Sequence, residues 1–124
     1  MVGGGCKILR SGYIGKIEPK DVGYSQNGHG TRFAGGISGS TSKVLLSFSK
    51  LISQNFAESV GGILGWYSGQ DANEITNSYV SSESNIESAN FVGGILGRTY
   101  DDYQIGTMEE TYSAAKVNSP GNQV

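Results

Sequence analysis

Acidic side chains gather in two stretches of the sequence where they could support acid–base chemistry. Asp101 and Asp102 are adjacent, with Arg98 nearby, and Asp71 and Glu74 lie in an earlier stretch. Hydrolysis of a glycosidic bond requires two carboxyl groups held roughly 5 to 10 Å apart. These residues therefore allow a carbohydrate-active site, although acidic residues in exposed turns more often serve only to face solvent.

The other reactive side chains form no recognisable catalytic or metal-binding pattern. The chain has a single cysteine, Cys6, and a single histidine, His29. One cysteine and one histidine cannot complete a tetrahedral zinc site, and a His-Glu-x-x-His metallopeptidase motif needs two histidines on one helix. We therefore predict no enzyme activity, no catalytic residues, no metal site and no cofactor. Cys6 also has no partner for an internal disulfide bond.

Glycine pairs recur through the 124 residues and divide the sequence into four similar units. A small hydrophobic residue precedes two glycines at Val2, Ala34, Val60 and Val92, at intervals of 32, 26 and 32 residues. Self-similarity at a period of about 20–50 residues is the signature of solenoids and arrays. We therefore predict one domain built from repeats. The repeat units are approximately 2–33, 34–59, 60–91 and 92–124.

Equivalent positions of these units carry similar residues, which indicates that the units stack in register. Isoleucines follow the glycine pairs at Ile37, Ile63 and Ile95. Aromatic residues recur later in each unit at Tyr13, Phe48, Tyr79 and Tyr112. An aliphatic residue or methionine lies four residues before each aromatic one, at Leu9, Val44, Ile75 and Met108. We predict that the isoleucine and aromatic columns form the core, with Tyr79 largely buried between its two stacked neighbours.

The local patterns favour short strands rather than helices. Residues 75–81 alternate between two sets of side chains, as in a strand, and two adjacent glycines would cost a helix about 2 kcal/mol relative to alanine. Turn-rich stretches separate such segments. We predict an all-β fold, a parallel β-solenoid of about four coils with roughly 26–32 residues in each. The competing architecture is an antiparallel sandwich, whose hairpins would not need the same sequence to recur at this interval.

Two short sequences carry a resemblance to a known family. Val-Gly-Gly-Ile-Leu-Gly at 60–65 and 92–97, and Ile-Thr-Asn-Ser-Tyr-Val-Ser at 75–81, resemble the GLUG repeat. That repeat occurs in large bacterial and protist surface proteins, including adhesins and the repeat regions of the M26 immunoglobulin A1 metallopeptidases. The resemblance covers the second to fourth units well and the first only in part. It implies a right-handed β-helix-like solenoid, in agreement with the usual handedness of parallel crossovers, that serves as a stalk or display surface.

The connection after the glycine pair is longer in the third and fourth units than in the second. If the units stack, the longer connections form one ridge of aromatic and acidic side chains, and insertions in solenoid repeats often map to a binding face. The candidate ligand-binding residues are Trp66, Tyr67, Asp71, Tyr100, Asp101, Asp102 and Tyr103. The alternative is that Trp66 and some of the tyrosines only cover the coil.

The net charge and the lack of a membrane-spanning or export segment limit the classes of partner that the sequence predicts. The net charge of −2 gives no pull toward nucleic acid, no apolar run approaches the ~20 residues that span a bilayer, and an export signal would have to lie outside this segment. The four units carry net charges of +3, +1, −4 and −2, so stacked units would form an axial dipole.

These observations favour a non-enzymatic structural or adhesive module of an extracellular or surface protein or fibre. We expect it to stack end to end on copies of itself or on flanking repeats of a longer solenoid, with surface glycans as a further class of ligand. The alternative function is a carbohydrate-binding or carbohydrate-active β-helix that uses the acidic and aromatic residues of the ridge.

Overall fold

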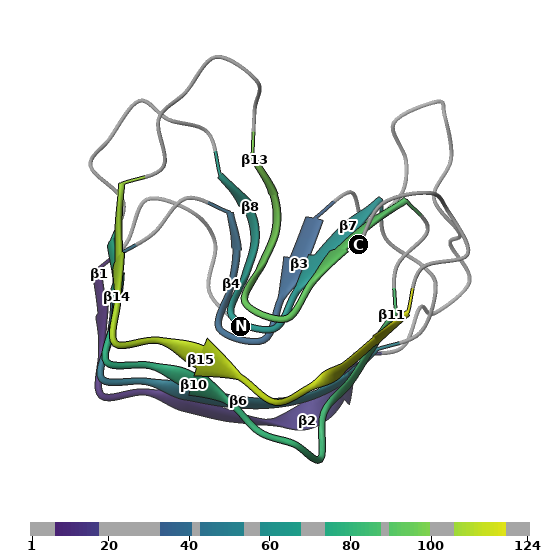
Figure 1. Ribbon diagram of the computed structural model, residues 1–124, viewed down its shortest axis with the longest axis horizontal. Coiled ribbons are helices and arrows are strands. Elements are labelled where there is room, and N and C mark those ends of the chain that lie inside the picture. The colour runs from purple at the N-terminus through teal and green to yellow at the C-terminus, as the bar shows by residue number, and fades with distance from the viewer. Residues whose placement is uncertain are drawn as a thin grey trace.

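The computed structural model describes residues 7–17, 33–40, 43–53, 58–67, 74–87, 90–99 and 106–118. All regular elements among these residues are β-strands, and they form parallel sheets that curl into a half-barrel (Figure 1). The all-β prediction is confirmed. The antiparallel sandwich is excluded for the described residues, because each strand pairing there is parallel.

The strands belong to four sheets. The wall sheet has the order β1 (Lys7–Leu9), β5 (Lys43–Leu45), β9 (Glu74–Thr76) and β14 (Thr107–Glu109). The floor sheet contains β2 (Gly12–Ile17), β6 (Phe48–Ser53), β10 (Tyr79–Val80), β11 (Asn85–Glu87), β15 (Tyr112–Ser113) and β16 (Lys116–Asn118). The first arm contains β3 (Phe33–Gly35), β7 (Ser59–Gly61) and β12 (Phe91–Gly93). The second arm contains β4 (Ser38–Ser40), β8 (Leu64–Tyr67) and β13 (Leu96–Thr99).

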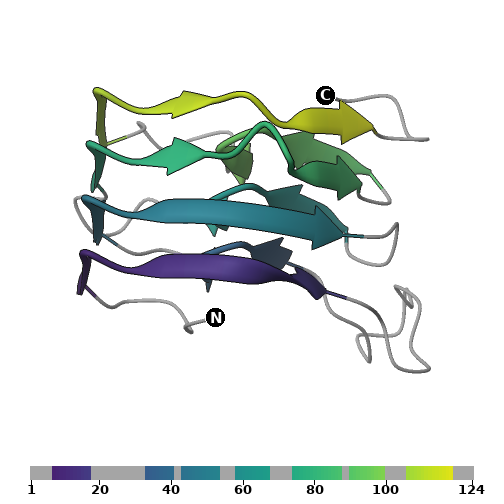
Figure 2. The same ribbon diagram turned by 90° about the horizontal axis from the view of Figure 1, so that it is seen from below.

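The sheets surround a common interior. In Figure 1 the wall sheet stands at one side, the floor sheet runs along the base, and the two arms form a narrow V above the floor. Figure 2 shows the floor strands as layers that follow the order of the sequence, from the purple β2 to the yellow β15 and β16. Neighbouring strands come from segments 26 to 36 residues apart in the sequence.

Like residues pair across these layers. The wall sheet pairs Ile8, Val44, Ile75 and Met108, and the first arm pairs Ala34, Val60 and Val92. The large side chains that are fully buried are Val44, Leu51, Val60, Ile63, Leu64, Val80 and Ile86. The predicted isoleucine column lies in this interior: Ile37 and Ile63 are buried, and Ile95 packs against the same cluster. The amide of Ile37 donates to the Ile63 carbonyl at 3.0 Å, and that of Ile63 donates to Ile95 at 2.9 Å.

Glycine lets the two arms approach each other backbone to backbone. A Cβ atom on Gly61 would collide with the carbonyl oxygen of Leu64 and would lie 2.6 Å from the nitrogen of Gly97. Across the same V, the hydroxyl of Ser59 donates a 2.8 Å hydrogen bond to the carbonyl of Gly65. The glycine pairs therefore mark positions where one backbone meets another, as glycine within strands often does.

The aromatic column forms, but on the outer surface of the floor sheet. The rings of Phe48 and Tyr79 stack with centroids 5.7 Å apart, and those of Tyr79 and Tyr112 with centroids 5.5 Å apart. Tyr79 is nonetheless 40% exposed and Tyr112 62% exposed, so the prediction that Tyr79 is largely buried is wrong. The inward position belongs to the next residue, Val80, and the apex of the V reaches it: a Cβ on Gly62 would lie 2.8 Å from Val80 Cγ2. An aromatic ring has no room there.

Tyr13 does not belong to the aromatic column. Gly12, not Tyr13, pairs with Phe48. A shift of one residue turns a side chain to the opposite face of a sheet, so Tyr13 packs against the core, and its predicted place in the aromatic column is wrong. The same shift places Ile8, instead of Leu9, in the aliphatic column of the wall sheet.

Candidate functional site

The structure places only part of the predicted ridge. Trp66 lies in β8, and its ring stacks on that of Phe33 with centroids 4.6 Å apart and planes 11° apart. Tyr67 is the last residue of the same strand, and its backbone pairs with that of Thr99. The Tyr67 side chain lies outside the described part of the chain, together with Asp71, Tyr100, Asp101, Asp102 and Tyr103. The stack of Trp66 on Phe33 therefore joins the two arms of the V, and the ridge itself stays a prediction.

An ion pair between Arg98 and Glu58 lies in the same region of the arms. Arg98 Nη1 lies 2.9 Å from Glu58 Oε1, and the guanidinium lies over the ring of Phe91, 4.3 Å from its centroid. Glu58 is only 7% exposed, and its carbonyl accepts the amides of Asn90 and Phe91 at 3.3 and 2.9 Å. Arg98 thus reaches a carboxylate 40 residues away in the sequence, a contact that no local pattern signalled.

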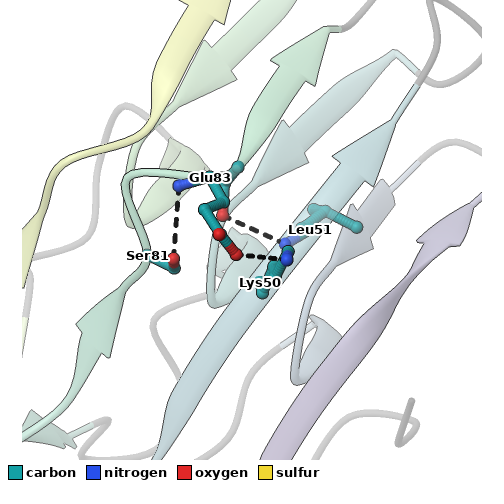
Figure 3. Close-up of polar contacts among 5 residues, drawn as sticks. Lys50, Leu51, Ser81 and Glu83 are labelled. Carbon is teal, nitrogen blue, oxygen red and sulfur yellow. Dashed lines mark hydrogen bonds and ion pairs between the residues drawn. The ribbon is translucent and has the colours of Figure 1, made fainter.

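A second ion pair lies on the outer face of the floor sheet. Lys50 of β6 pairs with Glu83, which lies in a turn between β10 and β11, as Figure 3 shows. The turn is held by the Glu83 amide, which donates to Ser81 Oγ at 3.2 Å, and by the Ser84 hydroxyl, which accepts the Leu51 amide at 3.1 Å. The Glu83 side chain is 66% exposed, so this pair adds little to stability.

The aromatic column occupies the same outer face. The ring of Tyr79 has a stacked neighbour on each side, whereas Tyr112 has one stacked partner among the described residues. Ile14 and Ile52 are also exposed on the floor sheet. This face therefore combines aromatic edges, aliphatic side chains and paired charges on one sheet.

A column of strained corners joins the wall sheet to the floor sheet. The corner residues, with their positive φ angles, are Arg10 (51°), Leu46 (50°), Asn77 (48°) and Glu110 (47°). Residues other than glycine rarely adopt this left-handed conformation, and asparagine tolerates it best. Each corner amide in the first three layers donates to the wall strand of the next layer: Arg10 to Leu45, Leu46 to Thr76 and Asn77 to Glu109, at 3.0 to 3.1 Å.

A serine or threonine follows each corner residue, and its hydroxyl group stabilises the corner with a hydrogen bond. The hydroxyl column consists of Ser11, Ser47, Ser78 and Thr111, and each hydroxyl donates to the carbonyl two residues before it, at 2.8 to 3.3 Å. The amide of Ser11 donates to Ser47 Oγ at 3.2 Å, and that of Ser47 to Ser78 Oγ at 3.1 Å. In the sequence, Ser47, Ser78 and Thr111 directly precede the aromatic residues of three units. This recurrence is a signal for the hydroxyl column, whereas the left-handed corner was not predicted.

The layer formed by β14, β15 and β16 is open to solvent at one end. Met108 and Tyr112 are exposed there, and among the described residues the amides of Glu110 and Thr111 have no acceptor. Val117 and Ile95 are partly exposed, whereas Ile86 and Ile63, their neighbours in the layer below, are fully buried. Strand edges of this kind are templates for pairing with another chain.

Comparison with known proteins adds no relative. No protein-family model, curated protein or solved structure matches the chain. The resemblance to the GLUG repeat therefore stays a prediction. In the described part of the chain, no helix is long and apolar enough to cross a membrane, and no group of three or more His, Cys, Asp and Glu residues could hold a metal ion.

Proposed function

We propose that the chain is a right-handed β-solenoid of about four coils, with roughly 26–32 residues in each, that serves as a non-enzymatic structural or adhesive module. The observation that carries this proposal is the register of like residues across the parallel sheets, as in the wall column of Ile8, Val44, Ile75 and Met108. The right-handed sense follows from the strong preference of parallel crossovers. The resemblance to the GLUG repeat supports the same conclusion.

Such a module acts as a stiff spacer. Layers of parallel strands lie about 4.8 Å apart, so four layers span about 19 Å along the axis. A single layer cannot bury its apolar residues alone and depends on its neighbours for stability. This dependence favours long arrays, which suits a stalk or fibre of an extracellular or surface protein, where the outer faces of the sheets are available to partners.

Glycan binding is the second candidate, and one observation favours it. Tyr112 exposes 62% of its surface beside the exposed edge of Tyr79, on the outer face of the floor sheet. Aromatic rings offer large apolar surfaces with a polar hydroxyl at the edge. Because the faces of Tyr79 are covered by its neighbours, Tyr112 is the ring that a sugar would contact. Trp66 is less suitable, since its ring stacks on Phe33.

A covalent tandem of two copies tests the solenoid proposal. If the coils continue from one copy into the next, small-angle scattering should show a rod whose length increases by about 19 Å over the single copy, with an unchanged cross-section. Two separate globular units on a flexible joint would give a larger and more variable extension, and that result would contradict the solenoid.

The glycan alternative needs a different measurement. Binding of neutral and acidic polysaccharides to the wild-type chain and to the variant Tyr112→Ala should be compared, with Phe33→Ala as a control that removes an aromatic residue from the arms. Binding that depends on Tyr112 alone, without release of reducing sugars, would favour an adhesive surface. Release of reducing sugars would contradict the non-enzymatic proposal.

A further inference from the structure

The two ends of the corner column carry opposite charges. The column begins at Arg10 and ends at Glu110, both exposed, while its middle members Leu46 and Asn77 are uncharged. We propose that the open β14–β15 edge of one copy binds the β1–β2 edge of a second copy, in the register that places Arg10 of the second copy beside Glu110 of the first. This inference rests on the proposed function, because it extends the stack of layers from one chain to the next.

The hydrogen bonds within the chain show which acceptors a second copy must offer at the joint. Arg10 donates its amide to Leu45, one layer up, and Ser11 donates its amide to Ser47 Oγ. In the last described layer, the equivalent donors are the amides of Glu110 and Thr111. A second copy in the same register offers Leu9 O to the first of these amides and Ser11 Oγ to the second.

Ser11 is already oriented for this role. Its hydroxyl proton is donated to Leu9 O at 3.3 Å, which leaves the oxygen free to accept an amide, as Ser47 Oγ does while it donates to Leu45 O. The first layer of a second copy therefore presents the same corner motif that each layer inside the chain presents to the one below.

The charges of the corner residues distinguish the joint between two copies from the contacts between neighbouring corner residues inside the chain. Inside the chain, no neighbouring pair of corner residues brings opposite charges together, whereas the joint would place the Arg10 guanidinium beside the Glu110 carboxylate. One column opposes the contact, since Lys16 of the second copy would lie near Lys116. Both lysines are exposed, and their long side chains can separate in solvent, where salt also screens them.

The apolar side chains fit the same register. Met108 would meet Ile8 of the second copy, as Ile75 meets Met108 within the chain. The half-buried Val117 would gain the cover that its counterpart Ile86 already has. Gly12 of the second copy lies opposite Tyr112, and the ring of Phe48 covers this glycine, so Tyr112 would meet an aromatic ring there.

Sedimentation velocity over a range of protein concentrations tests the joint. At about 25 mM salt we expect concentration-dependent assemblies without a fixed size, because a head-to-tail contact need not close. Each single charge reversal, Arg10→Glu or Glu110→Arg, should weaken association by tenfold or more. The double variant that carries both reversals should recover most of it, because the pair is then restored with its charges exchanged.

The control is Lys43→Glu, which reverses an exposed charge on β5, an inner strand of the wall sheet whose two neighbours, β1 and β9, belong to the same copy. It should leave association within twofold of the wild type. A wild-type chain that stays monomeric at low salt and high concentration would overturn the joint, and so would association that the single reversals do not weaken. Neither result affects the tandem rod measurement, so failure of this joint is distinguishable from failure of the solenoid.

Discussion

The arms and the outer face of the floor sheet use the same kinds of side chain in opposite ways. Both regions contain an aromatic stack and an ion pair. In the arms, the carboxylate of Glu58 has a side chain only 9% exposed and reaches Arg98, whereas on the floor the Glu83 side chain that pairs with Lys50 is 66% exposed. The difference separates groups that hold the fold from groups that are open to a partner, and residue type alone does not reveal it.

Glycine substitutions should give the largest contrast. In Gly61→Ala the new Cβ meets the backbone of Leu64 and Gly97, which cannot move aside, so we expect a loss of at least about 3 kcal/mol in the free energy of unfolding, or failure to fold. In Gly12→Ala the Cβ meets only the ring of Phe48, which can rotate into solvent. Urea denaturation followed by circular dichroism should show a loss below about 1 kcal/mol for Gly12→Ala. Equal losses would contradict the close packing of the arms.

The two ion pairs should differ nearly as much. Arg98→Met leaves the carboxylate of Glu58 almost buried without its cation, and breaking such a pair costs about 3 kcal/mol, somewhat less here because the Arg98 side chain is 31% exposed. Lys50→Met removes the cation of an exposed pair and should cost below about 1 kcal/mol. The comparison can be made by thermal and urea unfolding of both variants. A Lys50 effect as large as that of Arg98 would show that the floor pair also holds the fold.

The aromatic stacks should show a smaller contrast. Trp66 is the only tryptophan, so its fluorescence reports directly on the arms. Phe33→Ala should shift the emission of Trp66 to longer wavelength and cost about 2 kcal/mol, less than the roughly 3 to 5 kcal/mol of a fully buried aromatic residue, because Phe33 is only partly buried. Tyr112→Ala, on the floor, should leave the emission unchanged and cost about 1 kcal/mol. A change of Trp66 emission in the Tyr112 variant would mean that the two regions are coupled.

The corner column should give the smallest effect, and a stabilising one. Leu46 adopts a φ of 50° and is 49% exposed, so Leu46→Asn should relieve strain and stabilise the chain by about 0.5 to 1 kcal/mol. The reverse change, Asn77→Leu, should destabilise it by a similar amount. If both substitutions are neutral in urea denaturation, the corners are not strained.

The repeats made much of the fold predictable. Glycine pairs and recurring isoleucines indicated parallel layers in register, and the sheets have that register from the second unit onward. The first unit was misaligned by one residue because Gly12 occupies the aromatic position and Tyr13 stands next to it. Because glycine has no side chain, the search for a recurring aromatic residue in the first unit selected the neighbouring Tyr13.

The site was less predictable for physical reasons. Alternation in a strand separates two faces but does not say which one is inside. The inner face of the floor sheet takes Val80 rather than Tyr79 because the apex of the arms approaches it, and this contact joins β10 to Gly62, far from it in the sequence. The pairing of Glu58 with Arg98 spans 40 residues in the same way. Such contacts depend on how the layers curl, which periodicity does not encode.

The turn at Glu83 has a consequence for how new surfaces can arise in this molecule. Phe48 and Ile52 of β6 are four residues apart in the sequence. Their partners in the next layer, Tyr79 and Asn85, are six residues apart. Asn85 still pairs with Ile52 on one side and with Lys116 on the other, so the extra residues bulge outward and the next layer returns to the shorter spacing. Length added at this position is absorbed within one layer. A foreign peptide inserted between 82 and 83 would therefore be presented on the outside while the layers above and below keep their alignment.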